Sequence, residues 1–226
     1  MISLPATRFL GLDLHLRSHK ILINQPEFIK KVLNKFNMGS CKPTSIPMDP
    51  ATRLTASMTP TSEEEIFHMA KVPYREAVGC LLYISITCRP DISYAVSQVA
   101  KFCQNPGRAH WSGVKKILAY LSGTTELGIM FEKNETSPIS GYTDADYGDD
   151  LDNRCSTSGS VFFVYGNLVS WSSKRQKCIS QSTTEAEYVA ASDACKEAVW
   201  LSSLLTELGE TEEKSVPMYC DNQSAI

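Results

Sequence analysis

The stretch I-S-G-Y-T-D-A-D-Y-G-D-D-L-D, residues 139–152, places five acids directly after a strand-like run. Residues 139–143 have the pattern of a short strand, which ends at Asp144. Burying one carboxylate is costly, and several close together repel one another unless a cation or solvent separates them. The stretch therefore predicts either a metal site or a solvated acidic loop. Two later acids favour the metal site: Glu187, near the start of a long helix, and Asp221, at the end of another strand.

The second half of the chain alternates between strand and helix patterns in an order that predicts a mixed sheet. Its predicted elements are strands at 139–143, 159–165 and 168–172, a helix at 182–208, a strand at 216–220 and the onset of a helix at Asn222-Gln223. Gly166-Asn167 predicts a two-residue hairpin turn. A meander followed by a helical crossover to a parallel strand gives such a mixed sheet. Acids at the strand ends would then meet at its carboxyl edge, where ligands bind in such folds.

The start of the long helix, S-T-T-E-A-E-Y-V-A-A (182–191), offers two glutamates. Ser182 and Glu185 have the spacing of a capping box, which gives Glu185 a structural role. A helix advances about 100° per residue, so Glu187 lies on a different face from Glu185. That face carries small or apolar residues that allow the helix to approach a sheet closely: Ala190, Ala191, Ala194, Ala198 and Leu201. Taken alone, Glu187 fits the rim of an amphipathic helix equally well.

Residues 1–135 read as a mostly helical region. The predicted elements are a hairpin over 8–23, helices at 26–38, 74–85, 91–104 and 110–122, a helical piece near Glu63, and a Pro/Thr/Ser-rich linker at 43–60. No catalytic constellation is visible in this half. One face of the first helix carries Lys30, Lys31 and Lys35, which are candidates for phosphate contacts, although basic faces are more often simply solvated.

Charge, cysteine content and hydropathy narrow the class of protein to which the chain can belong. The 226 residues carry a net charge of −3, divided into about +5 over residues 1–135 and about −8 over residues 136–226. The asymmetry suits a polyanion-binding half beside a cation-requiring half, and it also suits two ordinary domains. The eight cysteines lack metal-finger spacing and are expected to be free thiols. The longest apolar run, residues 77–88, is too short to span a membrane, and no ordinary signal peptide is visible at the N-terminus.

Two short motifs suggest a polymerase site and a calcium-binding loop, and the neighbouring residues argue against both. Residues 147–150, Y-G-D-D, copy a polymerase metal motif, but that hairpin needs apolar strands on both sides and the continuation here is polar. A calcium-binding loop starting at Asp144 would need Gly at its sixth position and Glu at its twelfth, where this chain has Asp149 and Cys155.

A series of phrases in order along nearly the whole chain resembles the Pol polyprotein of Ty1/copia-type retrotransposons. The phrases are F-L-G-L-D-L (9–14), Q-P-E-F-I-K-K-V-L-N-K-F-N-M (25–38), P-M-D (47–49), Y-R-E-A-V-G-C-L-L-Y-I-S-I-T-C-R-P-D-I-S-Y-A-V (74–96), G-Y-T-D-A-D-Y (141–147), S-T-S-G-S-V-F (156–162), S-W-S-S-K-R-Q (170–176), S-T-T-E-A-E-Y-V-A (182–190) and Y-C-D-N-Q-S-A-I (219–226).

The resemblance implies an α/β fold, α+β overall, in two parts. Residues 1–135 are expected to be the C-terminal, thumb- and connection-like region of a reverse transcriptase, and residues 136–226 an RNase H-like domain. The family's polymerase acids lie upstream of this chain, so no polymerase active site is expected in it. The family's fourth ligand, last strand and last helix lie beyond Ile226, so the second part is expected to be truncated and weak or inactive in isolation.

The resemblance also assigns site residues. The family's first acid maps onto Asp144, its helix acid in the pattern Glu-x-x-Ala onto Glu187, and its third acid onto Asp221. Gln223 matches a position that contacts the hybrid in its minor groove. Thr183 and Thr184 occupy the loop before the helix, where relatives carry amide side chains. Candidates for phosphate contacts are Lys174, Arg175 and Lys177.

The chemistry implied is two-metal hydrolysis of the RNA strand of an RNA–DNA hybrid. Two Mg²⁺ or Mn²⁺ ions, about 4 Å apart, would be held by the three carboxylates and the scissile phosphate. Specificity would rest on minor-groove shape and 2′-hydroxyl contacts. The expected partners are the hybrid and the rest of a Pol polyprotein, in the cytoplasm or nucleus and with no membrane.

A different class of function is a retroelement-derived interaction protein without catalysis. One version is a secreted effector of a plant-infecting oomycete, because Arg8-Phe9-Leu10-Gly11 followed by Glu63-Glu64-Glu65 loosely imitates the Arg-x-Leu-Arg and acidic motifs of those proteins. Position 11 is Gly instead of Arg, and the first of these motifs is already explained as the start of a strand.

Overall fold

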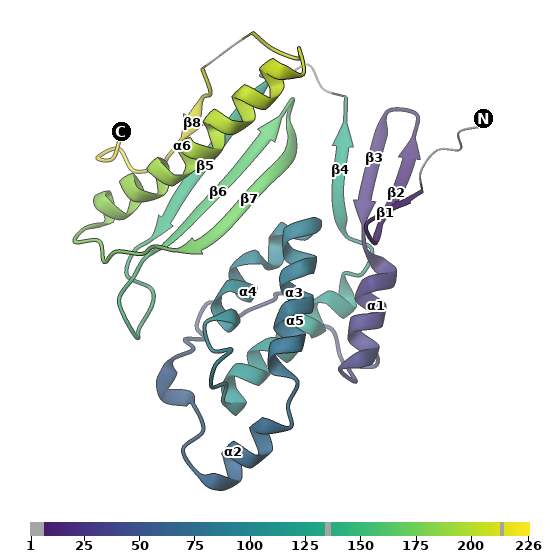
Figure 1. The fold of residues 1–226 in the computed structure, drawn as a ribbon, viewed down its shortest axis with the longest axis vertical. Helices are drawn as coiled ribbons and strands as arrows, with labels where there is room; N and C mark the ends of the chain where they lie inside the picture. Colours follow the sequence, from purple (N-terminus) through teal and green to yellow (C-terminus); the bar gives the residue numbers. More distant parts are fainter. Residues whose placement is uncertain (1–6, 134–136, 213–214) are drawn as a thin grey trace. The chain divides into compact units, whose positions relative to one another are not determined.

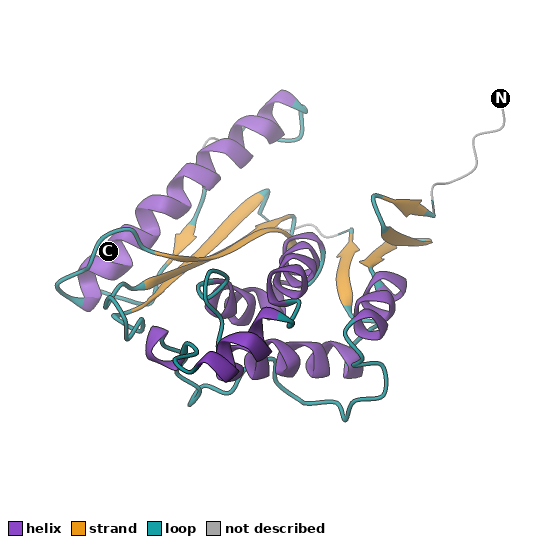
Figure 2. Cartoon of the chain, turned by 60° about the horizontal axis from the view of Figure 1, so that its bottom comes forward, coloured by secondary structure: helices purple, strands orange, loops and turns teal. Residues whose placement is uncertain are grey.

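The fold combines helices with two four-stranded sheets (Figure 1), which confirms the predicted α/β class. The computed structural model describes residues 7–133, 137–212 and 215–226. The chain divides into two compact units, Met1–Met130 and Phe131–Ile226. The predicted boundary between residues 135 and 136 lies outside the described residues. Figure 2 shows helices and strands within each unit.

The first unit holds a small sheet and a set of helices. Its elements are β1 (Arg8–Phe9), β2 (Leu12–Arg17), β3 (Lys20–Asn24), α1 (Pro26–Lys35), η1 (Ala56–Met58), α2 (Glu63–Ala70), α3 (Tyr74–Thr87), η2 (Pro90–Ile92), α4 (Ser93–Ala100), α5 (Arg108–Gly123) and β4 (Gly128–Glu132), which begins in this unit. The predicted hairpin is β2–β3, and the predicted strand from Arg8 is interrupted at Leu10 and Gly11, which both have positive φ. Strand β4 was not predicted; it follows β3 in the sheet order β1-β2-β3-β4.

The core of this unit forms where the helices present their apolar stripes to one another. In α1, Ile29, Val32 and Leu33 are buried, while Lys30 and Lys31 on the other face are exposed. These side chains join one cluster with residues of α3, α4 and α5, among them Leu81, Val96, Ile117 and Leu118. Helical periodicity thus determines which residues of each helix enter the core.

A buried arginine ties two loops of the first unit together. The Arg89 side chain is 1% exposed, and its Nε and Nη2 donate to the Asp91 carboxylate at 2.9 and 2.7 Å. Its Nη1 donates to the Thr124 carbonyl at 2.8 Å and its Nη2 to the Thr124 hydroxyl at 2.7 Å. Burial alone would raise the pKa of Asp91, but hydrogen bonds and charge from Arg89, with the Tyr120 hydroxyl, outweigh it and lower that pKa. The pair therefore stays ionised at neutral pH.

The second unit is a mixed sheet with one long helix. Its elements are β5 (Ile139–Asp146), β6 (Thr157–Val164), β7 (Asn167–Arg175), α6 (Thr183–Glu207) and β8 (Met218–Tyr219). The sheet order is β7-β6-β5-β8; β5, β6 and β7 form an antiparallel meander, and β8 runs parallel to β5. The predicted mixed sheet is confirmed.

One local prediction in the second unit is wrong. The hairpin turn is Tyr165-Gly166, with φ of 47° and 73°, one residue earlier than predicted. Asn167 is instead the first residue of β7, where its side chain exchanges hydrogen bonds with the backbone of Glu132 at 2.7 and 2.9 Å. At the predicted helix onset, the Asn222 side chain accepts from the Ser224 amide at 3.0 Å, and its carbonyl accepts from the Ala225 amide at 3.0 Å. These are the contacts of a helix N-cap, so the onset at Asn222-Gln223 stays a prediction.

Helix α6 covers one face of this sheet through its alanine stripe. Ala194, Ala198 and Leu201 pack with Ile139 and Phe162 in a buried cluster. The sheet itself is closely packed at Gly141, where an added Cβ would lie 2.5 Å from Met218 Sδ and 2.6 Å from the Phe162 ring. The position therefore has no room for a side chain.

Replacing Gly141 by Ala is expected to destabilise the second unit by about 1–3 kcal/mol, because Met218 and Phe162 must move out of well-packed positions. Gly79→Ala, in helix α3, is the matched control: nothing lies within 4 Å of its added Cβ, and the helix gains about 0.5–1 kcal/mol. Urea unfolding of both variants measures the difference. Equal stability of the two variants would contradict the close packing at Gly141.

Candidate metal centre

The first turn of α6 separates the two glutamates as the sequence predicts. Ser182 Oγ accepts a hydrogen bond from the Glu185 amide at 3.1 Å, and Glu185 Oε2 accepts one from the Gln181 amide at 2.7 Å. Glu185 is exposed and caps the helix, with its return bond going to residue 181 instead of residue 182. Glu187, in contrast, is buried on the face that also buries Ala190 and Ala194.

Glu187 sits in an environment that opposes its ionisation. Burial leaves the residue 6% exposed and raises the pKa of its carboxyl above the ordinary value. The negative charges of Asp144 and Asp221 raise this pKa further, while a backbone hydrogen bond from Ala145 opposes the shift. A divalent cation would offset the burial and both repulsions, so the electrostatics of this carboxylate fit a metal ligand.

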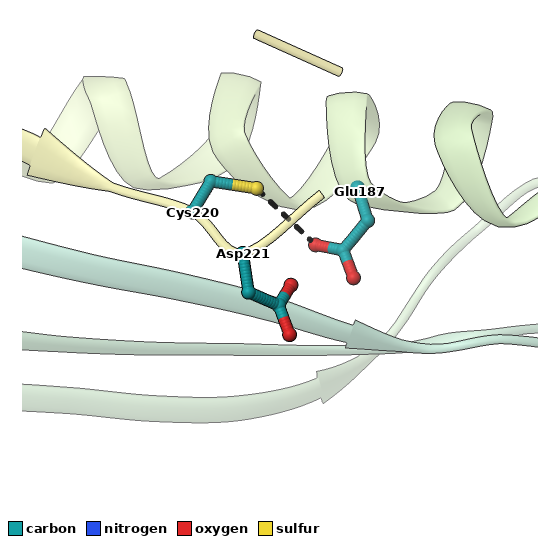
Figure 3. A group of neighbouring side chains, drawn as sticks. All are labelled: Glu187, Cys220 and Asp221. Carbon is teal, nitrogen blue, oxygen red and sulfur yellow. Dashed lines mark hydrogen bonds between the residues drawn. The ribbon is translucent and has the colours of Figure 1, made fainter. Parts of the chain in front are cut away.

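Three potential ligands converge at this point (Figure 3). In the described parts of the chain, the group of acids, thiols and imidazoles close enough to hold one ion is Glu187, Cys220 and Asp221, whose ligand atoms all lie within 4.8 Å of one another. Cys220 Sγ lies 3.8 Å from Glu187 Oε2. The two carboxylates suit a hard cation such as Mg²⁺, whereas the thiol does not.

Asp144 stands at the margin of this group and is not one of its members. It lies near the end of β5, is exposed, and its Oδ1 accepts a hydrogen bond from the Ala145 amide at 2.9 Å. It is close enough for its charge to raise the pKa of Glu187. The structure thus brings Glu187 and Asp221 together and leaves the Asp144 carboxylate beside them.

The Y-G-D-D stretch forms a loop that its second aspartate closes. Asp150 is 5% exposed and accepts a hydrogen bond from the Asp152 amide at 3.0 Å. Its Oδ2 also pairs with Arg175 Nη1 at 3.4 Å. These contacts give Asp150 a structural role, and they occupy one nitrogen of an arginine that the sequence suggested for phosphate contacts.

Five further residues suggested for nucleic-acid contacts lie on three segments of the second unit. Lys174 and Lys177 are exposed at and just after the end of β7. Thr183 is exposed and Thr184 half-buried in the first turn of α6, and Gln223 is exposed in the turn after Asp221. All five are accessible, at least in part, to a ligand.

Gln176 is a buried residue whose role the sequence did not reveal. Its Nε2 donates to the Ala186 carbonyl at 2.8 Å and to Ser158 Oγ at 3.0 Å, and its Oε1 accepts from Ser180 Oγ at 3.0 Å. It therefore joins the sheet to the backbone immediately before Glu187. In the sequence it appears within a short basic run, where only its uncharged amide distinguishes it.

Replacing Gln176 by Leu is expected to destabilise the second unit by about 1–3 kcal/mol, because the Ala186 carbonyl and the two serine hydroxyls lose a buried partner. The first turn of α6 should loosen, which faster amide hydrogen exchange in residues 183–190 would report. Gln181→Leu, at an exposed position before the helix, is the control. Unchanged exchange in Gln176→Leu would contradict the positioning role.

Comparison with known proteins supplies the family. The chain is 46% identical over 224 residues to the Retrovirus-related Pol polyprotein from transposon TNT 1-94 of Nicotiana tabacum, covering 98% of this chain and 17% of that protein. It is 33% identical over 203 residues to an uncharacterised mitochondrial protein of Arabidopsis thaliana, covering 88% of this chain and 80% of that protein. The chain belongs to the Pol polyprotein family of Ty1/copia-type retrotransposons.

The chain matches only part of a Pol polyprotein, and it also resembles a protein of another class. The chain spans about a sixth of the length of the tobacco polyprotein. It is also 42% identical over 134 residues to Secreted RxLR effector protein 161 of Plasmopara viticola, covering 59% of this chain and 94% of that protein. No family model and no solved structure matches the chain. None of the helices in the described residues is long and apolar enough to cross a membrane.

Proposed function

We propose that this Pol-derived chain contributes an RNase H-type endonuclease site that hydrolyses the RNA strand of RNA–DNA hybrids. The observation that carries the proposal is the buried Glu187 carboxylate, held against Asp221 and within reach of the charge of Asp144 at one edge of a mixed sheet. Structural carboxylates are rarely buried without a cationic partner, whereas metal ligands commonly are. Membership of the Pol family supports a retroelement role.

Asp144, Glu187 and Asp221 would hold divalent cations, Mg²⁺ or Mn²⁺, and two ions in a complete site. When bound, such ions activate the attacking water and neutralise charge on the scissile phosphate. Glu187 is fixed by α6, while Asp144 and Asp221 are exposed and free to approach an ion from the strand ends. Asp144, at the margin of the group, would complete the set of three carboxylates.

The surrounding residues would select the substrate. Gln223, Thr183 and Thr184 carry neutral polar groups suited to minor-groove and 2′-hydroxyl contacts, which distinguish RNA from DNA. Lys174, Lys177 and the outer part of Arg175 would contact phosphates. The remainder of the Pol polyprotein is the proposed partner, and a retroelement particle in the cytoplasm or nucleus is the proposed location.

The test is cleavage of a labelled RNA–DNA hybrid by the full chain with Mg²⁺ or Mn²⁺, compared with Asp144→Asn. Weak metal-dependent cleavage is expected for the unaltered chain, with a loss to background in the variant. Asp146→Asn, two residues further along β5, should retain cleavage as the matched control. Equal cleavage by the unaltered chain and Asp144→Asn, or neither binding nor cleavage of the hybrid by the unaltered chain, would contradict the proposal.

The second candidate is a non-catalytic interaction protein, in one version a secreted effector, and the similarity to an oomycete effector favours it. Arg8 of the motif-like stretch lies in β1, where its Nε pairs with Asp13 at 3.0 Å, so it has a structural partner. A reporter fused to the chain and expressed in an oomycete would test export. Export that is lost in Arg8→Ala would support the effector role, and retention inside the cell would contradict it.

A further inference from the structure

The candidate metal centre contains a sulfur atom that hard-cation chemistry does not use. Cys220 directly precedes Asp221, and Figure 3 shows its thiol turned towards Glu187 on α6. The three ligand atoms of Glu187, Cys220 and Asp221 come from a helix and from the end of a strand far away in the sequence. The Cys220 thiol donates a hydrogen bond to Glu187 Oε2 at 3.8 Å, and this bond joins the two segments.

The strand register explains why the thiol faces the helix. Strand β8 pairs in parallel with β5 through Gly141 with Met218 and Tyr142 with Tyr219. The rings of Tyr142 and Tyr219 stack with centroids 4.8 Å apart, and both are exposed. Side chains alternate along a strand, so Cys220 points to the opposite face, on the side of α6.

A second observation on that face also indicates a ligand. Strand β8 ends at Tyr219, and one further step of its register would bring Thr143 opposite Cys220, with both side chains on the same face. Thr143 is 6% exposed, and its hydroxyl has no hydrogen-bond partner among the described residues. Buried hydroxyls are nearly always hydrogen-bonded, so the Thr143 hydroxyl on this face is available to a ligand or to ligand-bound water.

We propose that Cys220 converts this centre into a mixed thiolate–carboxylate site that binds a borderline divalent cation of the Zn²⁺ class. Tetrahedral zinc with Zn–S of about 2.3 Å and Zn–O of about 2.1 Å separates its sulfur and oxygen ligands by about 3.6 Å. The observed 3.8 Å between Cys220 Sγ and Glu187 Oε2 is close to that spacing. Asp221, which is exposed, supplies the third ligand, and water completes the shell.

Binding replaces the sulfur–hydrogen bond by a zinc–sulfur bond and releases the thiol proton to solvent. Thiolate favours zinc over Mg²⁺, so zinc would hold the site against the hard ions. The consequence for catalysis rests on the proposed nuclease function. Zinc coordinated by Glu187 and Asp221 prevents these carboxylates from binding Mg²⁺ and so inhibits hydrolysis supported by Mg²⁺. The binding itself does not depend on that function.

The test is a titration of the full, reduced chain with Co²⁺, a spectroscopic substitute for zinc. A cobalt–thiolate charge-transfer absorption should appear with one equivalent of Co²⁺, and added Zn²⁺ should remove it. Cys220→Ser should abolish the absorption, and Glu187→Gln should weaken cobalt binding at least tenfold. Cys195→Ser, an exposed thiol on α6, is the matched control and should behave as the unaltered chain. The same absorption in Cys220→Ser, or its loss in Cys195→Ser, would overturn the proposal.

A measurement on the unaltered chain covers the case in which Cys220→Ser does not fold. Zn²⁺ should protect Cys220 from alkylation at least tenfold, measured by peptide mass spectrometry, while Cys178 and Cys195, both exposed, stay reactive. Unprotected Cys220 at saturating zinc would overturn the proposal. Cobalt absorption by a chain that neither binds nor cleaves the hybrid would contradict the nuclease function alone. Cleavage that saturating zinc leaves unaffected would contradict the inhibitory role alone.

Discussion

Glu187→Gln is expected to abolish hybrid cleavage while making the metal-free chain more stable. The loss of a metal ligand should cost at least about 100-fold in rate, because cation stabilisation of the transition state is worth several kcal/mol and each 1.36 kcal/mol is tenfold. The gain in stability follows from burial: Glu187 is 6% exposed, and burial together with two neighbouring carboxylates opposes its charge. Glutamine keeps the shape and removes that charge.

The stability difference should depend on pH with a definite sign. The pKa of folded Glu187 is raised above the ordinary value of 4.5, so the unaltered chain loses stability as pH rises from that value through the folded pKa. The Gln variant lacks this loss, and its advantage in thermal unfolding without metal should therefore grow from pH 4.5 upwards and then level off.

Glu185→Gln is the matched control for both readouts. Glu185 lies two residues before Glu187 on a different face of α6, and it is exposed. It serves the helix cap, which glutamine also satisfies. Its cleavage and melting temperature should match those of the unaltered chain. If Glu187→Gln cleaved the hybrid normally, the catalytic role of Glu187 would be rejected; if it were also less stable in the absence of metal, the electrostatic account of its burial would fail as well.

Arg89→Met should destabilise the first unit by about 3–5 kcal/mol, the range for removing one partner of a buried ion pair. The guanidinium is 1% exposed and satisfies the Asp91 carboxylate together with the carbonyl and hydroxyl of Thr124. Methionine fills most of the volume but leaves these acceptors without their donor. Urea unfolding followed by circular dichroism measures the effect, because five of the six α-helices of the described residues lie in this unit.

Two further variants show which property of Arg89 matters. Arg89→Lys keeps the charge but cannot donate from a planar fork to Asp91 and Thr124 together, so it should recover only part of the loss. Arg108→Met, at an exposed position in the first turn of α5, should stay within about 0.5 kcal/mol of the unaltered chain. A loss as small in Arg89→Met as in Arg108→Met would show that the network contributes little to stability.

The relation between sequence and site is clearest at the start of α6. The capping pattern Ser182-x-x-Glu185 and the alanine spacing after Glu187 were readable from the sequence, since both depend on local helix geometry. The contact between Glu187 and Cys220 was not readable, because it depends on the parallel register of β8 against β5. The positioning role of Gln176 could not be read from the sequence either, since two of its three hydrogen-bond partners lie 10 and 18 residues away.

Contacts with residues distant in the sequence explain the shifted hairpin turn and the pairing of Arg175. The hairpin turn moved by one residue because Asn167 is held by the backbone of Glu132, a contact that no turn rule includes. Arg175 was predicted to contact phosphate, but one of its nitrogens pairs with the buried Asp150, a partner 25 residues away that the local basic run does not reveal.

The sequence by itself determined the α/β class, the helical first region and the mixed sheet after residue 139, because hydrophobic periodicity and chain connectivity are properties of neighbouring residues. It also determined which acids come at strand ends and on the buried face of α6. Only the tertiary structure decided that a thiol joins Glu187 and Asp221 while Asp144 stays at their margin. Ångström-scale distances between segments follow from register and packing, which a linear pattern does not encode.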